Sequence, residues 1–172
     1  MTQGDVMAVL ATLIGICISS WSLTMAYGLL FPGKSQVAKH EVATRPGKCI
    51  SRGALILFTV GLVGLGLVSK APNPLLKLIG WVTLLTIFTV AALGMAGLAL
   101  NAGDRLKVMA PEMNPYAAFS RGAGFLIFAC IVPIVGWFAF GPLLYLAAIG
   151  AGVKAVLTPV DEPSSLPQAE IA

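Results

Sequence analysis

Four long stretches of this chain contain no Asp, Glu, Lys or Arg, and they restrict what it can fold into. They cover residues 6–33, 53–69, 78–100 and 122–153. A helix that crosses the hydrocarbon core of a bilayer needs about 20 mainly apolar residues. At the helix centre, Leu, Ile, Phe and Val each favour insertion by roughly 0.3 to 0.6 kcal/mol. The stretches therefore predict membrane-spanning helices.

Composition and pattern support the same fold class. The 172-residue chain is 58% hydrophobic and only 10% charged, whereas a soluble domain has about 25% charged residues. Strands of a β-barrel would alternate apolar and polar residues, and these stretches do not. We expect an all-α polytopic membrane bundle that forms a single domain over 1–157, with a flexible, acidic, proline-rich tail over 158–172. The four or five expected segments lie at 7–31, 53–69, 78–100, 120–132 and 134–155.

Charge on the linkers predicts the orientation of the bundle. Five Lys and Arg residues lie in the linker after the first stretch and three in the linker around 101–121, against two near 70–77. Because cytoplasmic loops are enriched in Lys and Arg, we expect both richer linkers in the cytoplasm and the N-terminus outside. Met1–Asp5 holds no basic residue, so we expect the first stretch to be a retained helix rather than a cleaved signal peptide.

Two segments of the chain resemble each other. Residues 46–58 and 115–128 each place a proline five positions before a Ser-Arg-Gly-Ala motif. Each copy then runs apolar, meets a break at 70–74 or 133–136, and runs apolar again. Duplicated units are common in polytopic membrane proteins, so we interpret this pattern as a repeated helix–break–helix unit. Residues 122–153 are then either one helix kinked by proline or a partly re-entrant hairpin, and the parallel favours the hairpin.

Small residues recur along the expected helices, partly at the four-residue spacing that lets helix backbones approach closely. They indicate helix-packing faces, either inside one bundle, which we favour, or between chains. The residues expected at such contacts are Gly15, Ser19, Gly61, Gly64, Gly94, Gly97, Ala148 and Gly152.

Hydroxyl side chains and one tryptophan form a polar seam in the first and third stretches. Tryptophan prefers the membrane interface, so its position near the middle of a stretch indicates either that the helix is shifted or that Trp21 and the hydroxyls face protein. Hydroxyls bond across helices or to carbonyls of their own helix. We interpret the seam as structural, with a small-molecule or pigment pocket as the alternative. Its residues are Ser20, Trp21, Ser22, Thr83 and Thr86.

Asp, Glu, His, Lys and Arg are missing from all four apolar stretches. Ion-coupled transporters, proton relays and voltage sensors keep such groups at membrane depth. The candidates outside, His40, Glu41 and Cys49, lie in the first linker, and adjacent His40 and Glu41 would point about 100° apart on a helix. The three cysteines have no CxxC spacing. We therefore expect no enzyme activity, no catalytic residue, no metal site and no cofactor.

Basic residues gather at the expected cytoplasmic ends of the helices. Each Lys or Arg near an anionic leaflet contributes roughly 1 kcal/mol to membrane attraction. We expect these residues to fix the orientation and to contact anionic lipids or a partner protein, with a solvated loop as an equal alternative. Nucleic acid is not expected as a partner. The residues are Lys34, Lys39, Arg45, Lys48, Arg52, Arg105 and Arg121.

Several short motifs follow one another in a fixed order: Phe31-Pro32, Arg45-Pro46-Gly47, Gly53, Val132-Pro133-Ile134-Val135-Gly136 and Gly150-Ala151-Gly152. This order resembles a small polytopic bacterial membrane domain that occurs alone or attached to bactofilin-type polymer-forming proteins. A second proline-containing turn of that family is only loosely matched by Ala71–Pro74, and polymerisation is not carried over. The resemblance implies a bacterial, membrane-embedded and non-enzymatic protein.

Together these features predict a non-catalytic membrane protein in a bacterial inner membrane or an internal membrane. We expect an accessory, assembly or scaffolding subunit of a larger complex, or a homo-oligomer packed through small-residue faces. The alternative is a small transporter or channel for a neutral or apolar solute. An enzyme at the membrane edge that uses His40 or Cys49 is the least favoured hypothesis. Native mass in mild detergent and liposome flux separate the first two.

Overall fold

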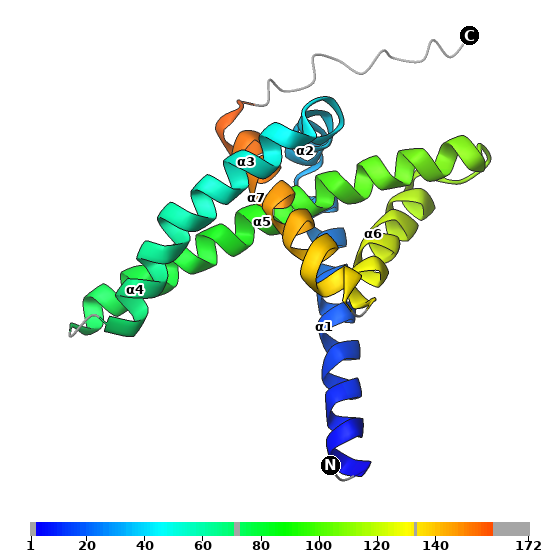
Figure 1. Ribbon diagram of the computed structural model, residues 1–172. Coiled ribbons are helices and arrows are strands. Elements are labelled where there is room, and N and C mark those ends of the chain that lie inside the picture. Colours follow the sequence, from blue (N-terminus) through cyan, green and yellow to red (C-terminus); the bar gives the residue numbers. More distant parts are fainter. Residues whose placement is uncertain (1–2, 71–72, 133, 160–172) are drawn as a thin grey trace.

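The computed structural model describes residues 3–70, 73–132 and 134–159, which fold into helices with no strand among them. This confirms the all-α fold class (Figure 1). Most of the tail expected over 158–172 lies outside the described residues. The elements in chain order are α1 (Gln3–Leu30), α2 (Pro32–Thr44), α3 (Pro46–Ile56), the π-helical η1 (Leu57–Gly61), α4 (Leu62–Lys70), α5 (Pro74–Met109), α6 (Pro115–Ile131), the π-helical η2 (Val135–Phe140) and α7 (Gly141–Leu157).

Four helical stretches of the described chain are long and apolar enough to cross a membrane: Asp5–Leu30, Pro46–Lys70, Pro74–Met109 and Val135–Leu157. The second joins α3, η1 and α4 without a break, and the fourth joins η2 and α7. The apolar helix α6 has only 17 residues, which is about 25 Å at 1.5 Å per residue and short of the roughly 30 Å hydrocarbon core. The chain is therefore a multi-pass membrane protein with a fifth, shorter apolar helix.

Local sequence explains where the helices begin. Proline occupies the first turn of α2, α3, α5, α6 and α7, where its missing N–H would have no helical partner. Asn73 and Asn114 cap α5 and α6, because each side chain accepts a 3.0 Å hydrogen bond from the backbone N–H two residues later. The first linker is therefore two helices, α2 and α3, rather than a loop.

Helix α5 is central, since α1, α2, α4, α6 and α7 all pack against it (Figure 1). The largest group of buried residues lies where α2, α6 and α7 meet the second half of α5. Small side chains dominate there, including Ala38 on α2, Ala99 on α5, and Ala148 and Ala151 on α7, all of them inaccessible. Small residues allow helix backbones to approach closely in a membrane. The bundle is held together by such crossings.

The N-terminal half of α1 lies apart from the bundle. Figure 1 shows it extending away from the other helices, and the most apolar 18-residue window of this helix has no buried residue. Only the C-terminal part of α1 contacts the rest through buried side chains, those of Thr24 and Met25. Lipid or another protein chain must therefore cover this apolar surface.

The chain reverses direction between α6 and η2, so residues 122–153 form a hairpin rather than one kinked helix (Figure 1). The turn is tight: Gly136 N–H donates to the carbonyl oxygen of Val132 at 2.8 Å. Ile134 has φ 68° and ψ −67°, values that belong to a strained turn for a β-branched residue. Pro133, expected at this break, lies outside the described residues.

The two Ser-Arg-Gly-Ala motifs occupy similar positions in the structure. A Cβ on Gly53 of α3 would overlap the backbone carbonyl of Leu146 on α7, and a Cβ on Gly122 of α6 would overlap that of Ala99 on α5. Each glycine is in the first helix of its unit and packs against the second helix of the other unit. Both copies are helix–break–helix units, as the repeat hypothesis requires.

Candidate functional site

The seven basic residues singled out above, here named the basic face, lie on α2, α3, α5 and α6 and at the junction of α2 with α3. Contacts between these elements bring several of them to one end of the bundle. Lys39 on α2 forms an ion pair with Asp104 on α5, and Lys34 on α2 bonds to carbonyl oxygens at the end of α7. The first linker, the end of α5 and the end of α7 therefore lie on the same side.

Two members of the basic face are used inside the fold. Lys39 pairs with Asp104, and Arg52 Nη1 donates to Glu41 Oε1 at 3.3 Å. Partly exposed pairs of this kind contribute about 0.2 to 1 kcal/mol each, so their main effect is positional: one ties α2 to α5 and the other ties α2 to α3. Lys39 and Arg52 are therefore less available to contact lipid or a partner than the sequence indicated.

Four other members face outward. Arg45, Lys48, Arg105 and Arg121 are all exposed. Arg121 contacts the sulfur of Met113, with 3.9 Å between Nη1 and Sδ. The side chains of Arg45, Lys48 and Arg105 make no ion pair or hydrogen bond within the part of the chain that the structure describes. These exposed cations are free to meet a membrane surface.

Lys34 is the remaining member, and it stands at one end of a groove, here named the Lys34 groove. Its ammonium donates to the carbonyl oxygens of Val156 at 3.2 Å and of Thr158 at 2.7 Å. These carbonyls close the last turn of α7, where backbone acceptors lack helical partners and the helix dipole favours a cation. The structure thus assigns Lys34 a capping role that the sequence did not indicate.

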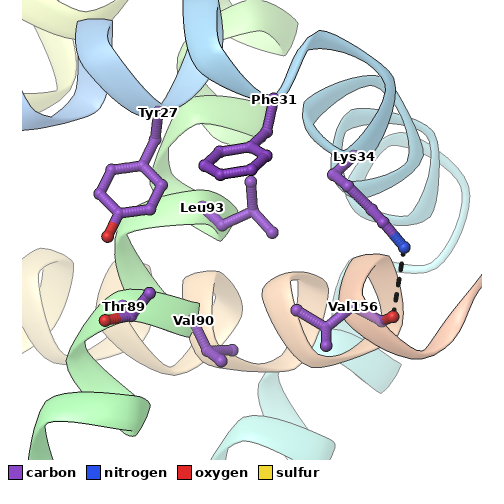
Figure 2. A pocket seen from close by; sticks show the side chains of 7 residues that line it. All are labelled: Tyr27, Phe31, Lys34, Thr89, Val90, Leu93 and Val156. Carbon is purple, nitrogen blue, oxygen red and sulfur yellow. Dashed lines mark hydrogen bonds between the residues drawn. The ribbon is translucent and has the colours of Figure 1, made fainter.

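The Lys34 groove is open to the outside and has a volume of about 210 Å³. Four helices meet around it: the end of α1, the start of α2, the middle of α5 and the last turn of α7. Figure 2 shows Lys34 at one end and Tyr27 with Thr89 at the other. The lining is almost entirely apolar and consists of Tyr27, Phe31, Lys34, Thr89, Val90, Leu93 and Val156.

A second hollow region, here named the mid-membrane cavity, lies between α1, α5, α6 and the start of α7. It consists of two adjoining cavities of about 200 and 260 Å³ that share Ser20, Met95 and Cys130. Apolar side chains dominate the lining, and Thr24 and Tyr145 add hydroxyls. The Thr24 hydroxyl already donates to the Ser20 carbonyl oxygen at 2.8 Å. The cavity therefore suits an apolar molecule with few polar groups.

The polar seam is divided between several places. Trp21 Nε1 donates to the Ser120 carbonyl oxygen at 3.2 Å and so ties α1 to α6, while Ser20 lines the mid-membrane cavity and Ser22 is exposed. The hydroxyls of Thr83 and Thr86 bond back to carbonyls of α5, both at 2.8 Å. The five residues do not form a single site.

The expected packing residues divide into three groups. The crossing of α5 and α7 contains Gly94, Ala148 and Gly152. An added Cβ on Gly94 or on Gly152 would overlap the backbone of the other helix. Gly61, Gly64 and Gly97 also lie at contacts, and Gly97 meets Ala38 on α2, a helix that the sequence did not place there. A Cβ built on Gly15 would have no atom within 4 Å, and Ser19 is exposed, so the expected packing inside the bundle is absent at these two positions.

Other close crossings were not singled out from the sequence. A Cβ on Gly150 would overlap the Cys49 carbonyl, and one on Gly103 would come within 2.7 Å of the Ala118 carbonyl oxygen. A Cβ on Gly80 would lie 2.9 Å from the Gly64 carbonyl oxygen. The Ser-Arg-Gly-Ala echo pointed to the region of Gly53 and Gly122, but nothing in the sequence identifies which helix each glycine meets.

The residues weighed for chemistry lie apart from any cavity described above. His40 is exposed on α2, and Cys49 is completely buried at the crossing of α3 and α7. Glu41 is taken up by its pair with Arg52. Among the described residues, no group of three or more His, Cys, Asp and Glu side chains is placed to hold a metal ion.

Comparison of the chain with protein-family models, curated proteins and solved structures gives no match.

Proposed function

We propose that the protein is a non-catalytic polytopic membrane protein that works as an accessory, assembly or scaffolding subunit of a larger membrane complex, or as a homo-oligomer. A bacterial inner membrane or internal membrane is its proposed location, in line with the resemblance in motif order. In this proposal the basic face is cytoplasmic and the N-terminus lies outside, since Lys and Arg are enriched on the cytoplasmic side.

The uncovered half of α1 carries this proposal. From that half to the middle of α1, Ala11, Gly15 and Ser19 present a small-residue face at four-residue spacing, and all three are exposed. A Cβ on Gly15 would meet no atom within 4 Å. Without a hydrophobic force between helices in lipid, such faces are the usual route to close helix association. The face has no partner within the described chain, so another helix can approach it.

Replacing Gly15 and Ser19 together by Leu tests the proposal. The protein is extracted in mild detergent and its native mass is measured, together with the identity of any chains that co-purify. We expect the wild type to exceed the monomer mass and the double variant to fall to the monomer. Gly66→Leu is the matched control, because Gly66 also has open space around it but lies on α4. A wild type that is monomeric and free of other chains would contradict the proposal.

A second candidate function rests on the mid-membrane cavity. A small transporter or channel for a neutral or apolar solute would use this cavity, with Ser20 and Tyr145 as polar contacts. Flux of such a solute into liposomes should then fall in Met95→Trp, because the larger side chain fills the cavity from α5. Flux that is absent from the wild type, or unchanged in Met95→Trp, would remove this alternative.

A further inference from the structure

We propose that the Lys34 groove binds one anionic phospholipid of the surrounding bilayer. An acyl chain lies along the apolar groove, and the phosphate sits at the Lys34 ammonium. This site is separate from the small-residue face on α1, so it stands or falls independently of assembly with other chains.

The lining fits a hydrocarbon chain. The rings of Tyr27 and Phe31 form one wall, with centroids 6.0 Å apart, and Val90, Leu93 and Val156 contribute aliphatic surface on the other sides (Figure 2). The Thr89 hydroxyl already donates to the Leu85 carbonyl oxygen at 2.9 Å, so it needs no partner in the groove. The interior therefore offers an acyl chain contact with little polar surface.

The depth of the groove matches a lipid. Phe31 and Leu93 lie between the two ends of the groove, and Tyr27 and Thr89 lie one helical turn earlier in the chain, on α1 and α5 (Figure 2). Lys34 follows the end of the first apolar stretch directly. The Lys34 end of the groove therefore lies at the edge of the apolar region, where lipid headgroups are found. The other end of the groove lies toward the hydrocarbon core.

Charge decides which lipid fits. An ammonium group has three donors, and two of those of Lys34 go to the carbonyl oxygens of Val156 and Thr158. One donor remains, and no carboxylate pairs with Lys34 among the described residues, in contrast to Lys39 and Arg52. The phosphate of an anionic lipid has no cationic group in the same headgroup. It can therefore accept the remaining hydrogen bond and neutralise the charge of the ammonium. The two carbonyl bonds also fix the ammonium in place before a lipid arrives, which favours binding.

Lipid binding in detergent tests the charged end. The delipidated protein is titrated with dioleoyl phosphatidylglycerol or dioleoyl phosphatidylcholine, and native mass spectrometry counts the bound lipids. We expect one phosphatidylglycerol per chain, bound about tenfold more tightly than phosphatidylcholine, and Lys34→Gln should weaken phosphatidylglycerol binding about tenfold, the loss expected for one hydrogen bond to a charged group. Lys48→Gln, at an exposed cation outside the groove, is the control and should change affinity by less than about twofold. Equal losses in the two variants would show diffuse attraction to the basic face and would overturn the proposal.

A second pair of variants tests the apolar part of the groove and leaves the Lys34 side chain unchanged. Val156 lines the groove from an exposed position, so Val156→Trp fills it, while the neighbouring Leu157→Trp places the same ring outside. We expect Val156→Trp to abolish retention of both lipids and Leu157→Trp to preserve it, with thermal stability in detergent measured for each. Unchanged retention in Val156→Trp contradicts the proposal. So does phosphatidylglycerol binding that appears only after residues 160–172 are removed, since the acidic C-terminal segment would then be the occupant.

Discussion

At the scale of single residues, Ser35 is unusual because its side chain is fully buried and its Oγ has no hydrogen-bond partner within the described residues. Other helical hydroxyls in the chain, such as those of Thr24 and Thr83, bond to the carbonyl four residues earlier. Leaving a buried hydroxyl unpaired costs about 1 to 3 kcal/mol. The Ser35 hydroxyl therefore adds no stability to the fold through hydrogen bonding.

Replacing Ser35 by Ala should raise the free energy of unfolding by about 1 kcal/mol, because the unpaired hydroxyl is removed and the small side chain is nearly kept. Thermal unfolding in detergent provides the measurement. Ser51→Ala, at an exposed serine of α3, should leave the midpoint unchanged. A lower midpoint for Ser35→Ala would mean that the hydroxyl makes a stabilising hydrogen bond.

Ile134 is a second unusual residue, since it holds a positive φ at the turn before η2. Backbone strain of this kind costs about 1 to 3 kcal/mol, whereas glycine carries an entropic cost of about 0.5 to 1 kcal/mol. The side chain is 75% exposed, so little packing is lost. Ile134→Gly should therefore raise the free energy of unfolding by up to about 2 kcal/mol. Val135→Gly, inside η2, should lower it in the same unfolding experiment, and the opposite order would refute a strained turn.

At the scale of the helices, glycines decide how closely the elements cross. Gly122 and Gly124 lie two residues apart on α6, and only Gly122 faces α5, where an added Cβ would overlap the Ala99 carbonyl. Gly124 has no atom within 4 Å of a built Cβ. One helix thus provides both a close crossing and an internal control.

Gly122→Ala should destabilise the fold by about 1 to 3 kcal/mol, because two backbones must move apart to admit a methyl group. Gly124→Ala should be neutral or stabilising by up to about 1 kcal/mol, because Ala favours the helix. Unfolding in a denaturing detergent gives both values. Similar values for the two variants would show that α6 does not pack against α5 through Gly122.

The spans were predictable from sequence and the crossings were not. Apolar stretches without charge identify membrane helices by length alone, and α1, α3–α4, α5 and η2–α7 overlap the segments expected at 7–31, 53–69, 78–100 and 134–155. Which helices meet depends on three-dimensional approach, which glycine spacing does not encode. Helix α2 illustrates this: its buried residues Ser35, Ala38 and Val42 fall on one helical face, but its polar composition indicated a surface linker.

At the scale of the whole molecule, the structure separates the start of α1 from the end of α7. Thr158 lies beside Lys34 at the start of α2, and α1 is a helix of 28 residues, about 42 Å long. These two ends therefore lie far apart, and in the proposed arrangement they face opposite sides of the membrane. Positively charged loops favour the cytoplasm for the α7 end.

Reporter fusions check this arrangement. A fluorescent protein that matures only in the cytoplasm should fluoresce when fused after Ala172 and stay dark when fused before Met1. Inserted directly after Arg45, in the connection of α2 to α3, the fluorescent protein should give the same result as the C-terminal fusion. Different signals at those two places would contradict the bonds between Lys34 and the end of α7.

The bond from Lys34 to Thr158 joins positions 124 apart in the sequence. It closes only after every intervening helix has been synthesised and inserted. Until then the inner face of α2 has no α7 to pack against, and the ammonium of Lys34 remains at the membrane surface. Contacts this distant in sequence form late, because the loop between them must first be ordered. Completion of the last helix is thus the event that joins α2 to α7, and a chain that stops before α7 keeps the contacts of α1 and α2 with α5 but lacks this bond.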